Sequence, residues 1–253
     1  MLPSSKARRR VGLARALSKL GYCSRSRAGE WIRAGRVTLN GRVCRDPEAP
    51  VRLPHDQISL DRRSVVAHAR VYLMLNKPRG VVTTASDEKG RETIYSYVGE
   101  EWPWVAPVGR LDKASEGLLL LTNDSEWAAR ILAPQTHVDK TYHVQVGTVA
   151  DAALLEAMQK GVQTGDGDFL RVRGVRILRA GQRNTWLEVV LDEGKNRHIR
   201  RLLAQLGVEV LRLVRVAIGP LELGKLAKGS VRPLTAEEKQ GLDRVAGRAS
   251  TLG

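Results

Sequence analysis

The segment with the strongest potential for chemistry runs from residue 107 to residue 124, PVGRLDKASEGLLLLTND. Asp112 stands between two cations, Arg110 and Lys113, shortly before a run of leucines that predicts a buried strand. Burial disfavours the ionised form of a carboxyl, whereas a neighbouring cation favours it. An ionised, partly dehydrated carboxylate is a capable nucleophile or general base. The alternative is a loop in which Asp112 only caps a turn.

The rest of the chain predicts the elements that would hold this segment in place. Apolar and polar residues alternate, as in half-buried strands, over residues 71–75, 141–146, 185–191 and 208–216. Helices are predicted over 126–132, 151–158 and 196–206, with a short final helix after a capping box at residue 235. Strands outnumber helices and do not alternate regularly with them. This favours an α+β fold with a mainly antiparallel sheet over a doubly wound parallel fold.

The composition narrows the class of protein. The chain has 253 residues and a net charge of +15, with 42% hydrophobic residues, which is enough for a packed core. Aromatic residues make up 4%, which argues against an aromatic platform for single strands. Cys23 and Cys44 cannot build a disulfide framework or a four-ligand zinc site, and low cysteine content suggests a reducing, cytoplasmic setting. No apolar run approaches the ~20 residues of a membrane span.

The charge is concentrated near the start of the chain. Residues 1–70 hold 16 Lys or Arg and 5 Asp or Glu, a net of +11, whereas residues 71–253 hold 26 and 22, a net of +4. A strongly basic chain points first to nucleic acid. The asymmetry predicts a small nucleic-acid-binding module joined to a larger, nearly balanced body.

Residues 11–60 combine this charge with a folding pattern. Apolar residues at helical spacing predict a helix ending at Gly21, and Ser24 can cap a second helix that ends near Gly35. Asn40 and Gly41 between two extended runs predict a hairpin with a type I′ turn. Four arginines decorate the second helix and its end, namely Arg25, Arg27, Arg33 and Arg36. Such a module can place guanidinium groups along phosphates.

The stretch ALSKLGYCSRSRAGEWIRAGRVTLNGRV resembles the S4 RNA-binding domain. The resemblance covers about residues 11–61 and implies structured RNA as the ligand rather than DNA. The alternative is a small folded domain whose arginines are only a solvated surface. The predicted organisation is a basic disordered tail at 1–10, an S4 domain at 11–62, a linker at 63–70, a catalytic domain at 71–240 and a C-terminal tail at 241–253.

The segment GRLDKASEGLLLLTND is similar to the signature of pseudouridine synthases. Three further stretches resemble motifs of the same family: LNKPRGVVTTASDEKGRETIY, KTYHVQV and LDEGKNRHIRRLLAQLGVEVLRLVRVAIGPLELGKLAKGSVRPLT. Together with the S4 domain, the arrangement resembles the RsuA/RluB-type family of bacterial ribosomal RNA pseudouridine synthases. That resemblance implies a mixed α+β catalytic domain that isomerises uridine on ribosomal RNA. Isomerisation adds no group and changes no oxidation state, so no cofactor or metal is expected.

The resemblance also implies roles for single residues. Asp112 corresponds to the catalytic aspartate, which would attack C1′ of the ribose or act as a base at C2′. Tyr142 would stack on the flipped-out uracil, Arg200 would pair with Asp112, and Arg110 would fill the gap in the RNA or clamp a phosphate. Leu191 is expected to be a wall of the pocket. Lys77, Arg79, Arg197 and Arg201 are expected to bind RNA.

Several points stay open in the sequence. His198 and Ser115 stand where Gln and Thr are usual in the family motifs. Some motif details favour the large-subunit RNA as substrate, and a small-subunit enzyme or a non-catalytic ribosome-assembly factor are the alternatives. The expected partner is ribosomal RNA or an assembly intermediate, and the expected state is a monomer in the cytoplasm.

Overall fold

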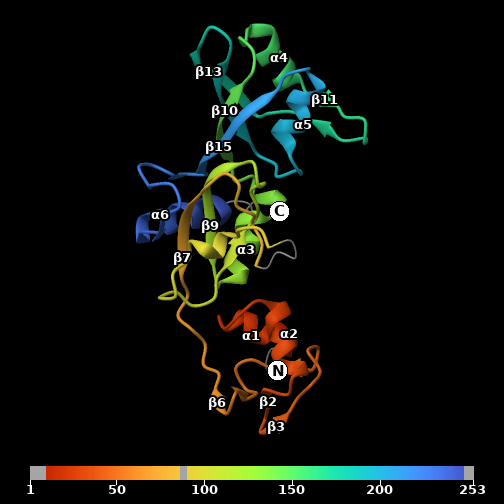
Figure 1. Cartoon of the computed structure of the whole chain (residues 1–253), viewed down its shortest axis with the longest axis vertical. Helices are drawn as coiled ribbons and strands as arrows, with labels where there is room; N and C mark the ends of the chain where they lie inside the picture. The colour runs from red at the N-terminus through yellow and green to blue at the C-terminus, as the bar shows by residue number, and fades with distance from the viewer. Residues whose placement is uncertain (1–9, 86–89, 248–253) are drawn as a thin grey trace, which may run out of the picture. The chain divides into compact units, whose positions relative to one another are not determined.

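The computed structural model describes residues 10–85 and 90–247, and the predicted disordered tail therefore lies almost wholly outside the described residues. The chain divides into two units, shown in Figure 1. The small unit comprises residues 1–71 with the short segments 100–106 and 122–125, and the large unit comprises the remainder. In the described ranges no helix has both the length and the apolar character needed to cross a membrane.

The small unit has the two helices and the hairpin that its sequence predicts. Helices α1 (Leu13–Lys19) and α2 (Arg25–Arg33) pack on a four-stranded sheet in the order β3-β2-β5-β6, and β1 (Val11–Gly12) pairs with β4 (Pro50–Val51). The sheet strands are β2 (Val37–Leu39), β3 (Arg42–Val43), β5 (Ile58–Leu60) and β6 (Arg63–Ser64). The Ser24 hydroxyl accepts from the Arg27 backbone N–H, and Asn40 and Gly41 both have positive φ, as a type I′ turn requires.

The predicted linker at 63–70 begins later than expected. Strand β6 pairs with β5, and the Val65 backbone N–H donates to the Ile58 carbonyl. Further on, the His68 N–H donates to the Leu20 carbonyl, and the His68 ring lies against Tyr22. The segment lacks a sequence period because it is held by single hydrogen bonds and ring contacts rather than by a strand or a helix.

The large unit is built on a nine-stranded sheet. Its order is β13-β14-β10-β15-β9-β7-β17, with β16 on β15 and β8 on β9. Most pairings are antiparallel, and β9 lies parallel to β15. The strands are β7 (Tyr72–Lys77), β8 (Ala106–Val108), β9 (Glu116–Thr122), β10 (Lys140–Val146), β13 (Gly174–Ala180), β14 (Thr185–Leu191), β15 (Val210–Ile218), β16 (Leu221–Glu222) and β17 (Val231–Pro233). This confirms the mixed α+β fold.

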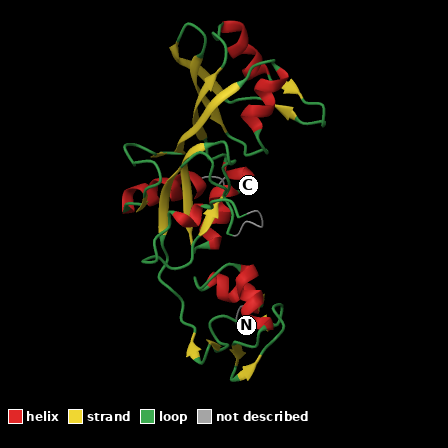
Figure 2. Cartoon of the chain, in the orientation of Figure 1, coloured by secondary structure: helices red, strands yellow, loops and turns green. Residues whose placement is uncertain are grey.

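Two cores lie against this sheet. Helices α4 (Ala152–Lys160) and α5 (His198–Gln205) contribute to the core around β10, β14 and β15, beside the small hairpin β11 (Val162–Gln163) and β12 (Phe169–Leu170). Helices α3 (Ser125–Leu132) and α6 (Ala236–Gly247) contribute to the core around β7 and β9. Short 3-10 helices occupy Ile94–Ser96 and Pro134–Thr136. Figure 2 shows the helices gathered beside the strands in each half of the unit.

The predicted C-terminal tail from residue 241 is wrong in its first part. The Thr235–Glu238 capping box forms as predicted, with the hydroxyl and the carboxylate each accepting a backbone N–H. Helix α6 then continues to Gly247 and buries Leu242 and Ala246 in the core. Those two apolar residues, four apart on one helical face, carry the helix past the predicted end.

Candidate active site

A cavity of about 700 Å³ lies in the large unit between the loop that follows β8, the end of β14 and the start of α5. Its lining includes five of the residues that the sequence singles out, namely Arg110, Asp112, Tyr142, Leu191 and Arg197. These residues come from three separate motifs, and the fold brings them to one wall. A cavity of this size is in the range that encloses small ligands in proteins.

Backbone contacts hold Asp112 in a tight turn. The Ser115 N–H donates to the Asp112 carbonyl over 2.9 Å, and the Thr83 hydroxyl donates to the Leu111 carbonyl over 2.8 Å. The Gly80 N–H donates to the Lys113 carbonyl over 2.7 Å. The segment after β7 is thereby bonded to the turn on both sides of Asp112, whose side chain is partly buried.

Lys77 lies beneath this turn rather than along an RNA path, which corrects the prediction that it binds RNA. Its side chain is 0% exposed, and its ammonium donates to the carbonyls of Pro78, Asp112 and Ser115. Burial lowers the pKa of Lys77 to about 8, although the charges of Glu116 and Asp112 oppose the shift. Lys77 therefore supports the turn from inside the protein.

Glu116 is a second charged residue buried beside the turn. It is 3% exposed and accepts hydrogen bonds from Arg212 and Lys228. Burial alone would raise the pKa of Glu116, but the bonds from these two cations outweigh it, and the net shift is downward. Next to it, Gly117 has φ +99°, and a Cβ there would collide with the Arg215 carbonyl of strand β15. Gly117 thus permits the close approach of a backbone.

Arg200 does not form the ion pair with Asp112 that the family resemblance implies. Within the described residues its guanidinium donates to the Ala114 carbonyl over 3.1 Å and to the Val210 carbonyl over 3.2 Å. Burial lowers the pKa of Arg200 and nearby Arg197 adds to this, while the charge of Asp112 acts in the opposite direction. The charge of the Asp112 carboxylate acts on the Arg200 guanidinium. The hydrogen bond from Arg200, however, goes to the carbonyl of Ala114, two residues after Asp112.

Three cations that line the cavity are absent from the sequence-based site, namely Lys140, Lys195 and Arg215. Lys140 and Tyr142 lie two residues apart on β10, so their side chains share the face that lines the cavity, and Arg215 stands opposite Tyr142 on β15. Arg215 is buried and donates through Nε to the Leu118 carbonyl, while its Nη2 has no partner among the described residues. Burial lowers the pKa of Lys140, and the charge of Arg215 adds to this. Period-two spacing from Tyr142 is the signal that would have found Lys140.

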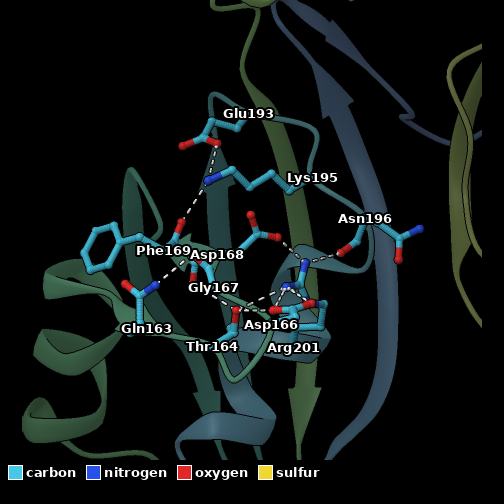
Figure 3. Close-up of polar contacts among 10 residues, drawn as sticks. All are labelled: Gln163, Thr164, Asp166, Gly167, Asp168, Phe169, Glu193, Lys195, Asn196 and Arg201. Carbon is cyan, nitrogen blue, oxygen red and sulfur yellow. Dashed lines mark hydrogen bonds and ion pairs between the residues drawn. The ribbon is translucent and has the colours of Figure 1, made fainter.

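Arg201 is not free to bind phosphate, which corrects another prediction. It forms ion pairs with Asp166 and Asp168 and also donates to the Asn196 carbonyl (Figure 3). Lys195 is held in a similar way, through the Phe169 carbonyl and Glu193. Both cations tether the loop of residues 192–197, which lines the cavity, to the loop between β11 and β12. The aspartates lie over thirty residues from Arg201 in sequence, so spacing gave no hint of the pairing.

Arg79 and His198 complete this region. Arg79 is exposed, and its charge contributes to the lowered pKa of Arg200. His198 is buried in the cavity wall, and its Nε2 lies 2.9 Å from the Arg171 carbonyl. Burial lowers the pKa of His198, so the ring is neutral at pH 7 and Nε2 is the donor to that carbonyl.

The four arginines on and just after helix α2 that are predicted to bind RNA are all exposed. Arg27 and Arg36 lie over the ring of Trp31, at 5.5 Å and 5.3 Å from its centre. Arg36 also pairs with Asp61. Arg25 and Arg33 form no ion pair with any described residue, which leaves their charges facing solvent. Trp31 was not singled out in the sequence, and its place among the arginines makes it part of this surface.

The comparisons with known proteins agree with this architecture. Residues 71–205 match the family model of RNA pseudouridylate synthases, and residues 11–58 match the S4 domain. The chain belongs to the RNA pseudouridylate synthase family and is an RNA pseudouridine synthase with an S4 RNA-binding domain.

Two relatives and one solved structure resemble nearly the whole chain. An uncharacterized RNA pseudouridine synthase of Aquifex aeolicus (strain VF5) is 38% identical over 94% of this chain and 95% of that protein. Ribosomal large subunit pseudouridine synthase B of Bacillus subtilis (strain 168) is 33% identical over 92% and 96%. A crystal structure of a pseudouridylate synthase superimposes with a TM-score of 0.62 at 28% identity, over 92% of this chain and 99% of that one.

Proposed function

We propose that this chain isomerises one uridine of large-subunit ribosomal RNA to pseudouridine, with Asp112 as the catalytic residue. The likeness to the Bacillus subtilis large-subunit enzyme, which extends over both units, supports the choice of RNA. The basic S4 domain supplies contacts to structured RNA beyond the target nucleotide.

The observation that carries the catalytic assignment is the place of Asp112 in the cavity wall. Its carboxylate shares that wall with Tyr142 and Leu191, which present an aromatic ring and an apolar side chain to an occupant. A uracil turned out of the RNA would find a surface to stack on, and its ribose would lie toward the carboxylate. Arg200 and Lys77, through the Ala114 and Asp112 carbonyls, fix the turn that carries Asp112.

The reaction rearranges the bonds of the uridine and adds no atom to it. The N1–C1′ bond breaks, the uracil turns, and a C5–C1′ bond forms, while the proton on C5 is lost and N1 gains one. Asp112 acts at the ribose in either of two ways, as a nucleophile at C1′ or as a base at C2′. Arg215 Nη2 and Lys140 place positive charge in the cavity, which favours electron-rich oxygens of the nucleotide.

The test is pseudouridine mapping of both ribosomal RNAs from cells with and without the gene, by carbodiimide labelling and primer extension. One lost stop in the large-subunit RNA should return with the wild-type gene and not with Asp112→Asn. Asn keeps the size of Asp but has neither the charge nor the basicity, so a rate loss of at least about 10³ is expected.

Three results would contradict the proposal. A stop restored by Asp112→Asn would remove Asp112 from the catalytic role. A lost stop confined to the small-subunit RNA would change the substrate, and no lost stop in either RNA would favour an assembly factor. Purified Asp112→Asn protein that still binds RNA within a few fold of wild type would show that the loss is chemical.

A further inference from the structure

A second concentration of positive charge lies far from the S4 domain in sequence. Between Phe169 and Leu187 the chain has five arginines and no Asp or Glu, although the body as a whole is nearly balanced. All five are exposed, namely Arg171, Arg173, Arg176, Arg179 and Arg183. We call residues 171–186 the arginine hairpin, because they comprise β13, its turn and the start of β14.

The arginine hairpin forms an edge of the large sheet. Strand β13 pairs with β14 alone in the sheet order, and Figure 1 shows α4 and α5 on one side of these strands. Val175 packs against the core on that side, whereas Arg176 stands opposite Glu188 on the other side. The face away from the helices therefore carries Arg176.

A β-bulge brings two arginines to this outer face. Arg176 pairs in register with Glu188, and after a shift between Ile177 and Arg179 the next partner is Trp186. Glu188 and Trp186 are two residues apart on β14 and so share a face. Arg176 and Arg179 are three residues apart, so without the bulge their side chains would point to opposite faces of the sheet.

The outer face also has the chemistry that nucleic acid contacts use. Arg179 and Arg183 form no ion pair with any described residue, so their charges are available. Trp186 lies between Arg179 and Arg212 on this face, and the Arg212 guanidinium is 5.8 Å from its ring centre.

The arginine hairpin begins at the cavity itself. The Arg171 carbonyl accepts a hydrogen bond from His198, which lines the cavity, and the Arg173 N–H donates to the Val190 carbonyl next to the lining residue Leu191. From there β13 runs seven residues away from the site, about 20 Å at the rise of a strand. RNA extending from a nucleotide in the cavity would meet this strand within a few phosphates.

We propose that the outer face of the arginine hairpin, with Arg179 and Arg183 as its free cations, is a second RNA-binding surface that holds the phosphate backbone beside the target uridine. The inference rests on the proposed function for the identity of the RNA. It does not depend on the S4 domain, whose arginines belong to the other unit. The competing explanation is that the charges only protect an exposed edge strand from pairing with another chain.

The test compares RNA binding by wild type and by the double variant Arg179→Gln/Arg183→Gln. The probe is a fluorescein-labelled stem–loop transcript carrying the mapped uridine, titrated by anisotropy at several NaCl concentrations. Loss of two phosphate contacts should lower the slope of log K against log [NaCl] by about 1.5 and weaken binding roughly tenfold at moderate salt. The rate at saturating RNA should stay within about twofold of wild type, because neither residue lies in the cavity wall.

Two matched variants distinguish the loss of a specific RNA contact at Arg179 and Arg183 from a general loss of positive charge. Lys225→Gln/Arg244→Gln removes the same charge from exposed positions near and on α6 and should keep the wild-type slope. Arg179→Lys/Arg183→Lys keeps the charge and should bind within about twofold of wild type. All three should melt like wild type, since the substituted side chains are exposed.

An unchanged slope and affinity in the Gln variant would overturn the proposal and leave edge protection as the role of these arginines. So would an equal loss in the Lys225/Arg244 control. Titration of an unrelated stem–loop of equal length tests the arginine hairpin even if no uridine is converted, because phosphate contacts are independent of sequence. Failure of the proposed function and failure of this surface are therefore distinguishable.

Discussion

The cations of the two units are used in opposite ways. In the small unit Arg25 and Arg33 face solvent on and beside a short helix, with no described carboxylate bound to them. In the large unit Lys77 and Arg200 donate to backbone carbonyls of the turn that holds Asp112, and buried Arg215 donates to the Leu118 carbonyl of β9. The comparison teaches that a cation in a family motif can serve the RNA or the fold, and that burial decides which.

The buried charges of the large unit should matter most for stability. Glu116→Ala removes a carboxylate that is 3% exposed and breaks its ion pairs with Arg212 and Lys228, whose side chains are 42% and 51% exposed. Because the two cations left behind keep contact with solvent, the expected cost is that of lost charged hydrogen bonds, about 1.5–3 kcal/mol. Urea unfolding should show that loss in the free energy of unfolding.

A matched surface pair gives the control. Glu156→Ala removes the partner of Lys160 four residues on along α4, where both side chains are exposed. That change should leave the free energy of unfolding close to the wild-type value, because exposed ion pairs contribute little to stability. Equal losses for Glu116→Ala and Glu156→Ala would show that the burial of Glu116 has no energetic consequence, and the distinction between buried and exposed charges would fail.

Much of this arrangement follows from the sequence, and the exceptions have a common cause. The hairpin at Asn40-Gly41, the cap at Ser24, the helix that starts near residue 151 and the strand containing Tyr142 depend on residues close in the chain. All of them form as predicted. The fold class follows from the same local signals. They carry their information within a few residues, so a single sequence is enough to find them.

The misplaced residues depend on contacts between distant segments. Lys77 reaches carbonyls more than thirty residues away, and the carboxylates that hold Arg201 lie about as far from it in sequence. A lysine before Pro78 or an arginine in a basic helix looks the same in sequence whether it is buried, paired or free. The arginine hairpin escapes detection for a different reason. Its positive charge is averaged out when the net charge is counted over the whole large unit.

The free arginines of the small unit should have the next largest effect, on RNA affinity. Arg25→Gln/Arg33→Gln removes two exposed charges and should weaken binding roughly tenfold and lower the salt slope by about 1.5. Anisotropy with a stem–loop RNA measures both. Point variants are preferable to deletion of residues 1–62, because that cut would separate β5 from its partner β6.

Arg201→Gln is the comparison on the large unit. Its charge is already neutralised by Asp166 and Asp168, so the salt slope should stay at the wild-type value. A slope lowered as much by Arg201→Gln as by the small-unit variant would show that the ion pairs open on RNA binding. The assignment of Arg201 to the fold would then be wrong.

The smallest effect is a pH dependence that comes from Lys77. As an ammonium it has three N–H donors for its three carbonyls, and as a neutral amine it has two, so one of the three hydrogen bonds beneath the Asp112 turn is lost. Because burial lowers the pKa of Lys77 to about 8, the rate at saturating RNA should fall a few fold as pH rises from 7 to 9.5. Single-turnover rates across that range measure the change.

Loss of folded protein through the titration of Lys77 cannot produce this decline in rate, because that titration makes the folded state more stable as the pH rises. The pKa is about 8 in the folded protein and 10.5 ordinarily, so between these values the unfolded chain binds more protons. Stability from this group therefore rises with pH across that window. Lys77→Met should be slower than wild type at pH 7 but lose the dependence near pH 8. A fall in rate near pH 8 that persists in Lys77→Met would assign the titration to another group. Lys77 would then have only a structural role beneath the turn.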